Sequence, residues 1–187
     1  MDYFCDVTLK PDPDFVPAVL LNALFSKLHR ALALQPNLSV GVSFPQYSLK
    51  PMTLGSKLRL HGTRSDLDSL FQQDWLTGMK DHIDCSEVAA IPQQHQHIRV
   101  RRVQAKSNPE RLARRYAKRH GIDLDDARQK YQRMKPVKLH FPFLSLNSQS
   151  TGQRFTLFIN QENILQYALP GEFNRYGLSQ DATVPWF

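Results

Sequence analysis

The stretch DPDFVPAVLLNALFSKLHRALALQ, residues 12–35, constrains the architecture more than any other part of the chain. Its apolar residues recur about every four positions, which is the spacing of one face of an α-helix. The residues on that face are Val16, Leu20, Leu24, Leu28 and Leu32. The pattern therefore predicts a long amphipathic helix that packs through this face.

Strands are predicted on both sides of this helix. Residues 2–10 alternate between apolar and polar side chains, which is typical of a strand with one buried face. The residues of that face are Tyr3, Cys5, Val7 and Leu9. Three later segments also have strand-like patterns: LSVGVSF (38–44), SKLRLHG (56–62) and SEVAAIP (86–92).

A second helix is predicted for SDLDSLFQQDWLTGMKDH, residues 65–82, starting at a capping box of Ser65 and Asp68. The resulting order β-α-β-β-α-β is the ferredoxin-like pattern. We therefore expect an α+β fold with a ferredoxin-like domain over residues 1–94.

The polar segment PQQHQH, residues 92–97, predicts a linker to a second α+β domain over residues 95–187. After a strand or extended arm at 98–104, a helix is predicted from about 108 to 120. Asn108 can cap it, Pro109 suits its first turn and Gly121 can end it. A further helix at 123–135, capped by Asp123, and three strands complete the expectation. The strand segments are VKLHFPFLSL (137–146), RFTLFIN (154–160) and ILQYAL (164–169).

Positive charge is concentrated in one part of the sequence. Residues 99–138 hold 14 lysines and arginines against four acidic residues, whereas the rest of the chain has slightly more acids than bases. A basic block on a slightly acidic scaffold indicates a polyanionic partner, above all a nucleic acid. Charge alone does not separate DNA from RNA.

Within this block, ERLARRYAKRHG (110–121) places its charges along one side of the predicted helix. The basic stripe consists of Arg111, Arg114, Arg115, Lys118 and Arg119, with leucine, tyrosine and alanines opposite. A solvated helix face is the alternative interpretation, but we expect no acid to pair with the stripe at i,i+4. The small residues opposite make a membrane-surface helix a poor fit.

His29 is a candidate general base. It lies at the border between the apolar face and the solvent-facing side of the helix at 12–35, where a histidine can be both oriented and accessible. Such a base can activate the 2′-hydroxyl of RNA for attack on the adjacent phosphate, a reaction that needs no metal. An ordinary border histidine remains the alternative from position alone.

Other classes of site are poorly supported. His95 and His97 lack a nearby thiol or carboxylate, so a zinc site is weak, and no metal or other cofactor is expected. Neither a P-loop, a dinucleotide fingerprint nor a G-x-S-x-G elbow is present in the sequence. With no long apolar run, no signal-like N-terminal segment and only Cys5 and Cys85, we expect a cytoplasmic protein with two buried, reduced thiols.

Several longer strings carry a resemblance that spans essentially the whole chain. They are RVQAKSNPERLARR (102–115), SQSTGQRFTLFI (148–159), YGLS (176–179) and VPWF (184–187). The sequence closely resembles the CRISPR-associated endoribonucleases of type I-F systems. That resemblance implies a ferredoxin-like domain, an arginine-rich helix and metal-independent cutting of precursor CRISPR RNA at the 3′ base of the repeat stem-loop.

The resemblance also implies residue roles. His29 corresponds to the general base, Ser148 to the serine that orients the 2′-hydroxyl and Tyr176 to a tyrosine that positions the histidine. Arg102 and Gln104 correspond to readers of base edges. Together with the basic stripe, the candidate RNA-binding residues are Arg102, Gln104, Asn108, Arg111, Arg114, Arg115, Lys118, Arg119, His120, Ser150, Thr151 and Phe155.

The resemblance further implies partners. These are the precursor and mature CRISPR RNA and the other subunits of the type I-F interference complex, with no membrane and a monomer when alone. A non-catalytic module that only binds structured RNA is the alternative function. Ala113 and Lys118 stand where this family often has arginine, so we expect the contacts to the RNA phosphates to be shifted or weaker at these two positions.

Overall fold

The computed structural model describes residues 1–105, 109–134, 138–148 and 151–187, and it shows a mixed α+β protein. The chain forms two compact units, which are described separately. Unit 1 comprises Met1–Val103 with Phe141–Phe187, and unit 2 comprises Gln104–His140. This division reflects which residues pack together within each unit. The expected boundary between a domain over 1–94 and a recognition domain over 95–187 stays a prediction.

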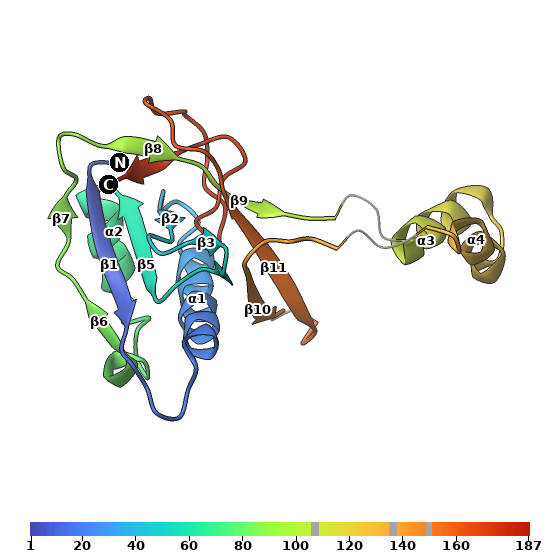
Figure 1. The fold of residues 1–187 in the computed structure, drawn as a ribbon, viewed down its shortest axis with the longest axis horizontal. Helices are drawn as coiled ribbons and strands as arrows, with labels where there is room; N and C mark the ends of the chain where they lie inside the picture. The colour runs from blue at the N-terminus through green and yellow to red at the C-terminus, as the bar shows by residue number, and fades with distance from the viewer. Residues whose placement is uncertain (106–108, 135–137, 149–150) are drawn as a thin grey trace. The chain divides into compact units, whose positions relative to one another are not determined.

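The main sheet of unit 1 has the strand order β2-β5-β1-β6, and every pair is antiparallel (Figure 1). Its strands are β1 (Tyr3–Leu9), β2 (Gly41–Ser43), β5 (Lys57–Gly62) and β6 (Ile83–Cys85), and β7 (Ala89–Ala90) pairs with the other end of β1. The predicted strands at 2–10 and 56–62 are confirmed. The expected strand at 86–92 is reduced to β7, because the chain already pairs with β1 at β6.

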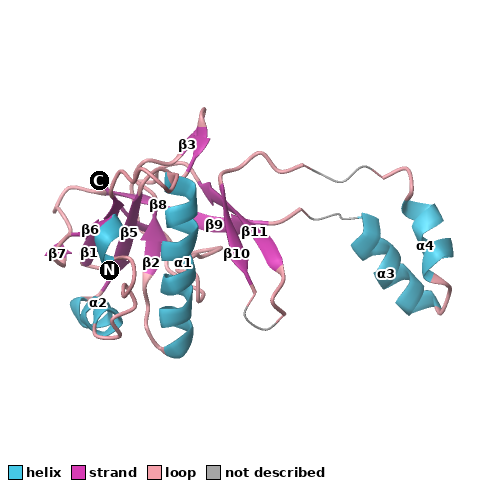
Figure 2. Cartoon of the chain, turned by 90° about the horizontal axis from the view of Figure 1, so that it is seen from below, coloured by secondary structure: helices cyan, strands magenta, loops and turns pink. Residues whose placement is uncertain are grey.

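Helix α1 (Pro17–Leu34) buries the predicted apolar face, and Leu20, Leu24, Leu28 and Leu32 are all buried. Val16 lies before the helix and is exposed, because the helix starts at Pro17, whose fixed φ suits the first turn. Helix α1 lies between the two larger sheets (Figure 2).

Helix α2 (Arg64–Phe71) is shorter than predicted and starts earlier. Its N-cap is Thr63, whose hydroxyl accepts from the Asp66 backbone N–H at 3.1 Å and donates to the Asp66 carboxylate at 2.8 Å. The expected capping box of Ser65 and Asp68 was therefore wrong by two residues. The chain turns directly after β5 ends at Gly62, so Thr63 is the residue available to cap. A 3₁₀ turn, η1 (Lys80–His82), follows.

A second, three-stranded sheet of unit 1 has the order β10-β11-β9. Its strands are β9 (Val100–Val103), β10 (Phe143–Asn147) and β11 (Arg154–Gln161). Two side-chain amides tie this sheet to the remainder of the unit. Asn22 Oδ1 accepts from the Ser145 backbone N–H at 2.9 Å, and the Gln161 amide both accepts from and donates to the backbone of Phe44.

Two small pairs of strands were not predicted. They are β3 (Ser48–Leu49) with β4 (Met52–Thr53), and β8 (Gln96–Ile98) with β12 (Val184–Trp186). The expected linker at 92–97 thus ends within a strand. The expected strand at 164–169 is absent from the described structure apart from one bridge between Leu165 and His97, so that prediction was wrong. Both pairings are too short to give a periodic pattern, and β8 and β12 also lie far apart in the sequence, so no local signal indicates them.

Unit 2 contains α3 (Pro109–His120) and α4 (Leu124–Tyr131). The two helices pack through Ala113 and Ala127, whose side chains are fully buried. Gly121 ends α3 with a positive φ of 63°, and the Asp123 carboxylate caps α4 by accepting from the Asp125 N–H at 2.7 Å. Both boundaries were predicted, whereas the proposed cap Asn108 lies outside the described residues.

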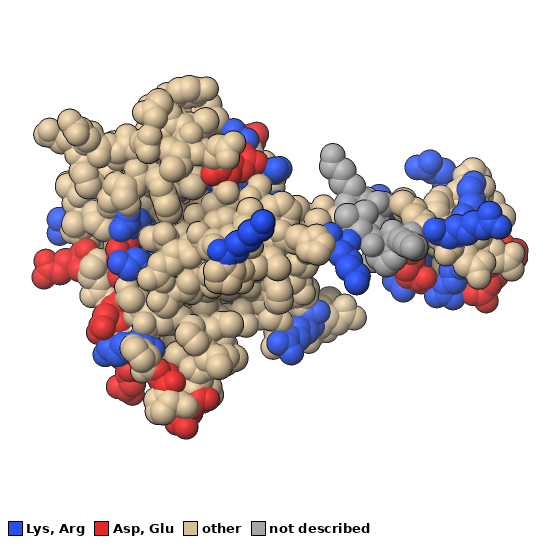
Figure 3. All heavy atoms as spheres, viewed as in Figure 1, with Lys and Arg blue, Asp and Glu red and all other residues tan. Residues whose placement is uncertain are grey.

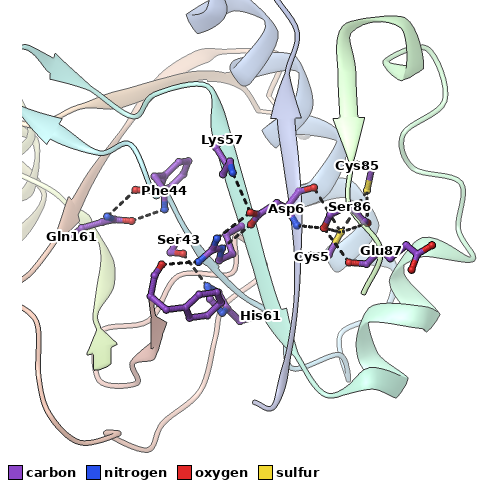
Figure 4. A network of polar contacts seen from close by, with 12 residues as sticks. Cys5, Asp6, Ser43, Phe44, Lys57, His61, Cys85, Ser86, Glu87 and Gln161 are labelled. Atoms are coloured by element: carbon purple, nitrogen blue, oxygen red, sulfur yellow. Dashed lines mark hydrogen bonds and ion pairs between the residues drawn. The ribbon is translucent and has the colours of Figure 1, made fainter. Parts of the chain in front are cut away.

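The face of the main sheet opposite the helices carries a polar network (Figure 4). The Arg59 guanidinium, almost completely buried, makes two hydrogen bonds to Asp6, at 2.7 and 3.0 Å. On the other face, Cys5 Sγ lies 3.5 Å from Cys85 Sγ. Cys5 is buried as expected. Cys85 was also expected to be buried, but it is exposed because β6 is an edge strand of the sheet.

A buried histidine in this network makes stability depend on pH. His61 Nε2 lies 2.8 Å from Ser43 Oγ, and both side chains are fully buried. Burial, reinforced by the charge of Arg59 and opposed by Asp6, lowers the pKa of His61 from 6.5 to about 3. The native ring therefore stays neutral in mildly acidic solution, where an unfolded histidine takes up a proton.

We expect the free energy of unfolding to fall as the pH drops from about 6.5 towards 4, because only the unfolded state then protonates His61. The loss is on the order of a few kcal/mol. Urea midpoints measured across this range should fall less in a Ser43→Ala/His61→Leu double variant. A variant of the exposed His140, His140→Gln, serves as control and should keep the wild-type slope. Equal slopes for the wild type and the double variant would contradict the assignment.

Candidate active site and nucleic-acid interface

The packing of α1 on β10 determines where His29 lies. Asn22 contacts Ser145, and His29 is seven residues further along α1, about 10 Å at the helical rise. Ser148 is three residues beyond Ser145, also about 10 Å in an extended chain. Because the two segments run in the same direction, His29 and Ser148 reach the same place.

A pocket of about 270 Å³ occupies that place. Its lining comes from little more than one turn of α1 and from the β10–β11 hairpin. The residues are Ser26, His29, Arg30, Leu146, Asn147, Ser148 and Phe155. The structure thus brings together three residues that the sequence suggested for the site: the catalytic candidates His29 and Ser148 and the RNA-binding candidate Phe155.

The hydrogen bond of His29 defines its tautomer. Its Nδ1 lies 2.8 Å from the backbone carbonyl oxygen of Arg175. A carbonyl oxygen only accepts, so Nδ1 carries the proton and donates it. In the neutral ring, Nε2 then holds the lone pair, which is the state a general base requires.

Tyr176 fixes the orientation of the same ring. The two rings stack with centroids 4.0 Å apart and planes 7° apart, and Phe25 continues the stack behind Tyr176 at 6.4 Å. The tyrosine sits on a tight turn in which the Asn174 side chain accepts from the Tyr176 N–H at 2.8 Å. Gly177 follows with φ 68°, and a Cβ there would lie 2.6 Å from the Val42 side chain. This turn therefore carries the tyrosine whose ring stacks on His29.

Ser148 lies at the end of β10, at the start of the turn to β11. Its backbone N–H donates to Gln153 O and its carbonyl accepts from Gly152, both at 2.8 Å. The Thr151 N–H donates to Ser148 Oγ at 3.3 Å, and Thr151 is exposed. Ser150 lies outside the described residues. These hydrogen bonds fix the turn that carries Ser148, which lines the pocket.

Phe155 and Arg102 lie on neighbouring strands of the second sheet. Phe155 on β11 is half-buried, and the Arg102 guanidinium on β9 lies 6.0 Å from its ring centroid. The backbone carbonyl of Arg102 accepts from Gln180 Nε2 at 3.2 Å, which fixes the strand end. Arg102 is thus on unit 1 near the pocket, whereas the expected second base reader, Gln104, is an exposed residue of unit 2.

The basic stripe of α3 is exposed, as Figure 3 shows for the lysines and arginines on the face of unit 2 that it draws. The expectation that no acid pairs with the stripe was wrong for one member. Glu110 binds Arg114 at 3.2 Å and Arg128 at 2.8 Å, because α4 folds back onto α3 and brings a second arginine to the same carboxylate. These guanidinium groups lower the pKa of Glu110 and keep it ionised.

The other cations of the stripe differ from Arg114 in their contacts. Within the described part of the chain, Arg115, Lys118 and Arg119 form no ion pair and are exposed, while Arg111 is exposed at the other end. His120 packs its ring on Tyr116 at 4.2 Å. Three cations of the stripe are thus available to an external polyanion.

Four residues of the pocket were missed by the sequence reasoning: Leu146 and Asn147 on β10, and Ser26 and Arg30 on α1. Ser26, His29 and Arg30 stand at positions i, i+3 and i+4 of α1, so both His29 and Arg30 are helical neighbours of Ser26. This spacing was a usable signal. It was overlooked because the far wall of the pocket, β10 and β11, cannot be placed from the sequence of α1.

Two further findings concern metals and membranes. Within residues 1–105, 109–134, 138–148 and 151–187, no three histidine, cysteine or acidic side chains group so that they could hold a metal ion. None of the helices in this described part combines the length and apolar character needed to span a bilayer.

The site defines a class first: an α+β protein with an oriented histidine beside a serine, and a separate, strongly basic helix. Comparison with known proteins then gives the family. Residues 4–187 match the family described as CRISPR-associated protein (Cas_Csy4), and the chain belongs to it. Two relatives are each named CRISPR-associated endonuclease Cas6/Csy4. That of Pseudomonas aeruginosa (strain UCBPP-PA14) is 44% identical and that of Escherichia coli (strain UTI89 / UPEC) 39% identical, both over 187 residues and 100% of each chain.

Proposed function

We propose that this chain is a metal-independent endoribonuclease that binds the repeat stem-loop of precursor CRISPR RNA and cuts at the 3′ base of the stem. Membership of the family and the names of the two relatives support endonuclease activity. The observation that carries the mechanism is the His29 ring, whose Nε2 lone pair is free to accept a proton beside Ser148. Without that geometry, the family alone would leave the chemistry open.

The reaction is an internal transesterification. His29 Nε2 accepts the proton of the 2′-hydroxyl, the 2′-oxygen bonds to phosphorus, and the bond from phosphorus to the 5′-oxygen breaks. The products are a 2′,3′-cyclic phosphate and a 5′-hydroxyl, the leaving oxygen taking its proton from solvent. Ser148 orients the attacking hydroxyl and Tyr176 keeps the imidazole plane aligned.

Recognition uses both units. Phe155, half-buried at the pocket, stacks on the terminal base pair and so fixes where the stem ends relative to His29. Arg102 and Gln104 read base edges, and Ser150 and Thr151 contact the backbone at the cut. The phosphate contacts come from the α3 residues, Arg111, Arg114, Arg115, Lys118, Arg119 and His120, with Asn108 at the helix start.

Further parts of the proposal concern architecture and assembly. The main sheet with α1 and α2 corresponds to the ferredoxin-like domain expected over 1–94, and the strand order β2-β5-β1-β6 supports this. The protein acts in the cytoplasm, is monomeric alone, keeps its product bound and joins the other subunits of the type I-F interference complex.

A module that only binds RNA is the second candidate, and the exposed stripe of α3 favours it equally. The two candidates differ at His29, because binding alone does not require a ring with a fixed tautomer stacked on Tyr176.

A repeat hairpin with a single 2′-deoxy sugar at the cut site tests the proposal. In excess EDTA, we expect the all-ribose hairpin to be cut to a cyclic-phosphate end, and the deoxy hairpin to bind with similar affinity but stay intact, because it lacks the nucleophile. Gel analysis of end-labelled RNA gives the products, and filter binding gives the affinity. Cutting of the deoxy hairpin, or a strict requirement for added metal, would contradict the mechanism.

A further inference from the structure

Resting on the proposed function, we propose that Arg30 is a further catalytic residue, which stabilises the negative charge that builds up on the scissile phosphate. Arg30 follows His29 on α1 and lines the same pocket. Of the seven lining residues, all of them described, it carries the only permanent positive charge. The roles proposed for His29, Ser148 and Tyr176 concern the nucleophile and its base, and none of these side chains brings a permanent positive charge to the scissile phosphate.

The helix geometry puts Arg30 at the rim of the pocket. Ser26, His29 and Arg30 stand at positions i, i+3 and i+4, which share one side of a helix. His29 is half-buried and Arg30 is exposed, so the arginine comes from the solvent side while the imidazole comes from the wall. In this arrangement, a phosphate beside His29 Nε2 lies within reach of the guanidinium.

The surroundings leave Arg30 available for this task. No aspartate or glutamate lines the pocket, and in the described part of the chain the Arg30 guanidinium has no ion pair or hydrogen bond. The neighbouring Arg154 is instead held by Ser145 Oγ at 2.6 Å, and Arg175 contributes its backbone carbonyl to His29. Leu146 and Phe155 supply apolar walls, which strengthen an electrostatic contact by limiting water.

The chemistry requires such a group. In the ground state, the phosphodiester carries one negative charge, and the five-coordinate transition state concentrates more charge on its two non-bridging oxygens. A guanidinium presents paired N–H donors that match two oxygens, so its contact strengthens as the reaction proceeds. A contact that strengthens only in the transition state raises the rate and changes the affinity little.

Single-turnover cleavage with saturating enzyme in EDTA tests Arg30 directly. We expect Arg30→Gln to slow cutting about 10²-fold, in the range found for loss of one oxyanion donor, and Arg30→Lys to lose roughly tenfold. Affinity for the 2′-deoxy hairpin should stay within about threefold in both. The matched control is Arg64→Gln, which removes an exposed helical arginine that does not line the pocket and should cut at the wild-type rate.

A second readout separates a phosphate contact from a structural effect. Sulfur replacing one non-bridging oxygen of the scissile phosphate should slow the wild type, and this thio effect should shrink in Arg30→Gln for the oxygen that the guanidinium faces. The inference is overturned if Arg30→Gln cuts as fast as Arg64→Gln, if rate and affinity fall equally, or if the thio effect is unchanged. If the wild type itself does not cut, or His29→Ala cuts as well as wild type, the proposed function fails instead.

Discussion

Replacement of His29 by alanine is expected to slow cleavage of the repeat hairpin by about 10²–10⁴-fold and to leave hairpin affinity nearly unchanged. The imidazole lines the pocket, and its Nδ1–H donates to the Arg175 carbonyl. Nε2 of the neutral ring therefore carries the lone pair that can accept a proton. Its removal takes away the proton acceptor for the 2′-hydroxyl. It removes no group that we assign to RNA binding, so the affinity should survive.

Two controls sharpen this test. His95→Ala removes another half-buried histidine of unit 1 away from the pocket, and it should cut normally. Tyr176→Phe keeps the ring that stacks on His29 and should retain most of the rate, because the stack and not the phenol oxygen orients the imidazole. Single-turnover rates and filter binding on the same RNA give both quantities. Full activity of His29→Ala would remove the base from the mechanism.

The second large effect is expected on affinity. Changing Arg115, Lys118 and Arg119 together to glutamine should weaken hairpin binding about 10²–10³-fold near 0.1 M salt. Each lost phosphate contact costs roughly 0.7–0.9 decades of affinity per decade of salt, and these three cations are exposed with no ion pair among the described residues. The slope of log affinity against log salt should become shallower by about two to three.

The control for this triple variant removes the same number of charges elsewhere. Lys10, Arg64 and Lys80 are partly exposed cations of unit 1 that already pair with carboxylates. Their triple glutamine variant should bind nearly as the wild type and keep its salt slope. If both triple variants lose affinity alike, net charge rather than the stripe explains binding. Cleavage at saturating enzyme should survive in the α3 variant, because the pocket is built by unit 1 alone.

Local signals predicted the elements that depend on local physics. The leucines of α1 repeat at helical spacing, Gly121 adopts the positive φ that ends α3, and Asp123 caps α4. The elements that were predicted wrongly depend instead on segments outside the local sequence. Thr63 caps α2 because β5 ends just before it, and β12 exists only because β8 lies beside it. Sequence windows do not contain such neighbours.

The site residues also fall into those that local sequence indicates and those that it does not. His29 could be suggested from its place at the border of an amphipathic helix, whereas Ser148, Tyr176 and Phe155 were indicated only by resemblance. The pairing of Glu110 with Arg114 was within reach, since the two are four residues apart, but its link to Arg128 needs the fold of α4 onto α3. The helical spacing of Arg30 could be read from the sequence, but its place beside Ser148 and Phe155 could not, because that depends on where β10 and β11 pack.

The bond from His29 to the Arg175 carbonyl joins residues 146 positions apart. Contacts of such long sequence separation form late, since a long loop must close before they contribute. Ribosomes add residues from the N-terminus, so α1 can form while its partner carbonyl has not yet been synthesised. A nascent or truncated chain without the turn at Tyr176 therefore carries the histidine but not its orientation. If His29 is the base, as proposed, nuclease activity requires synthesis beyond Tyr176, and incomplete translation products should be harmless to cellular RNA.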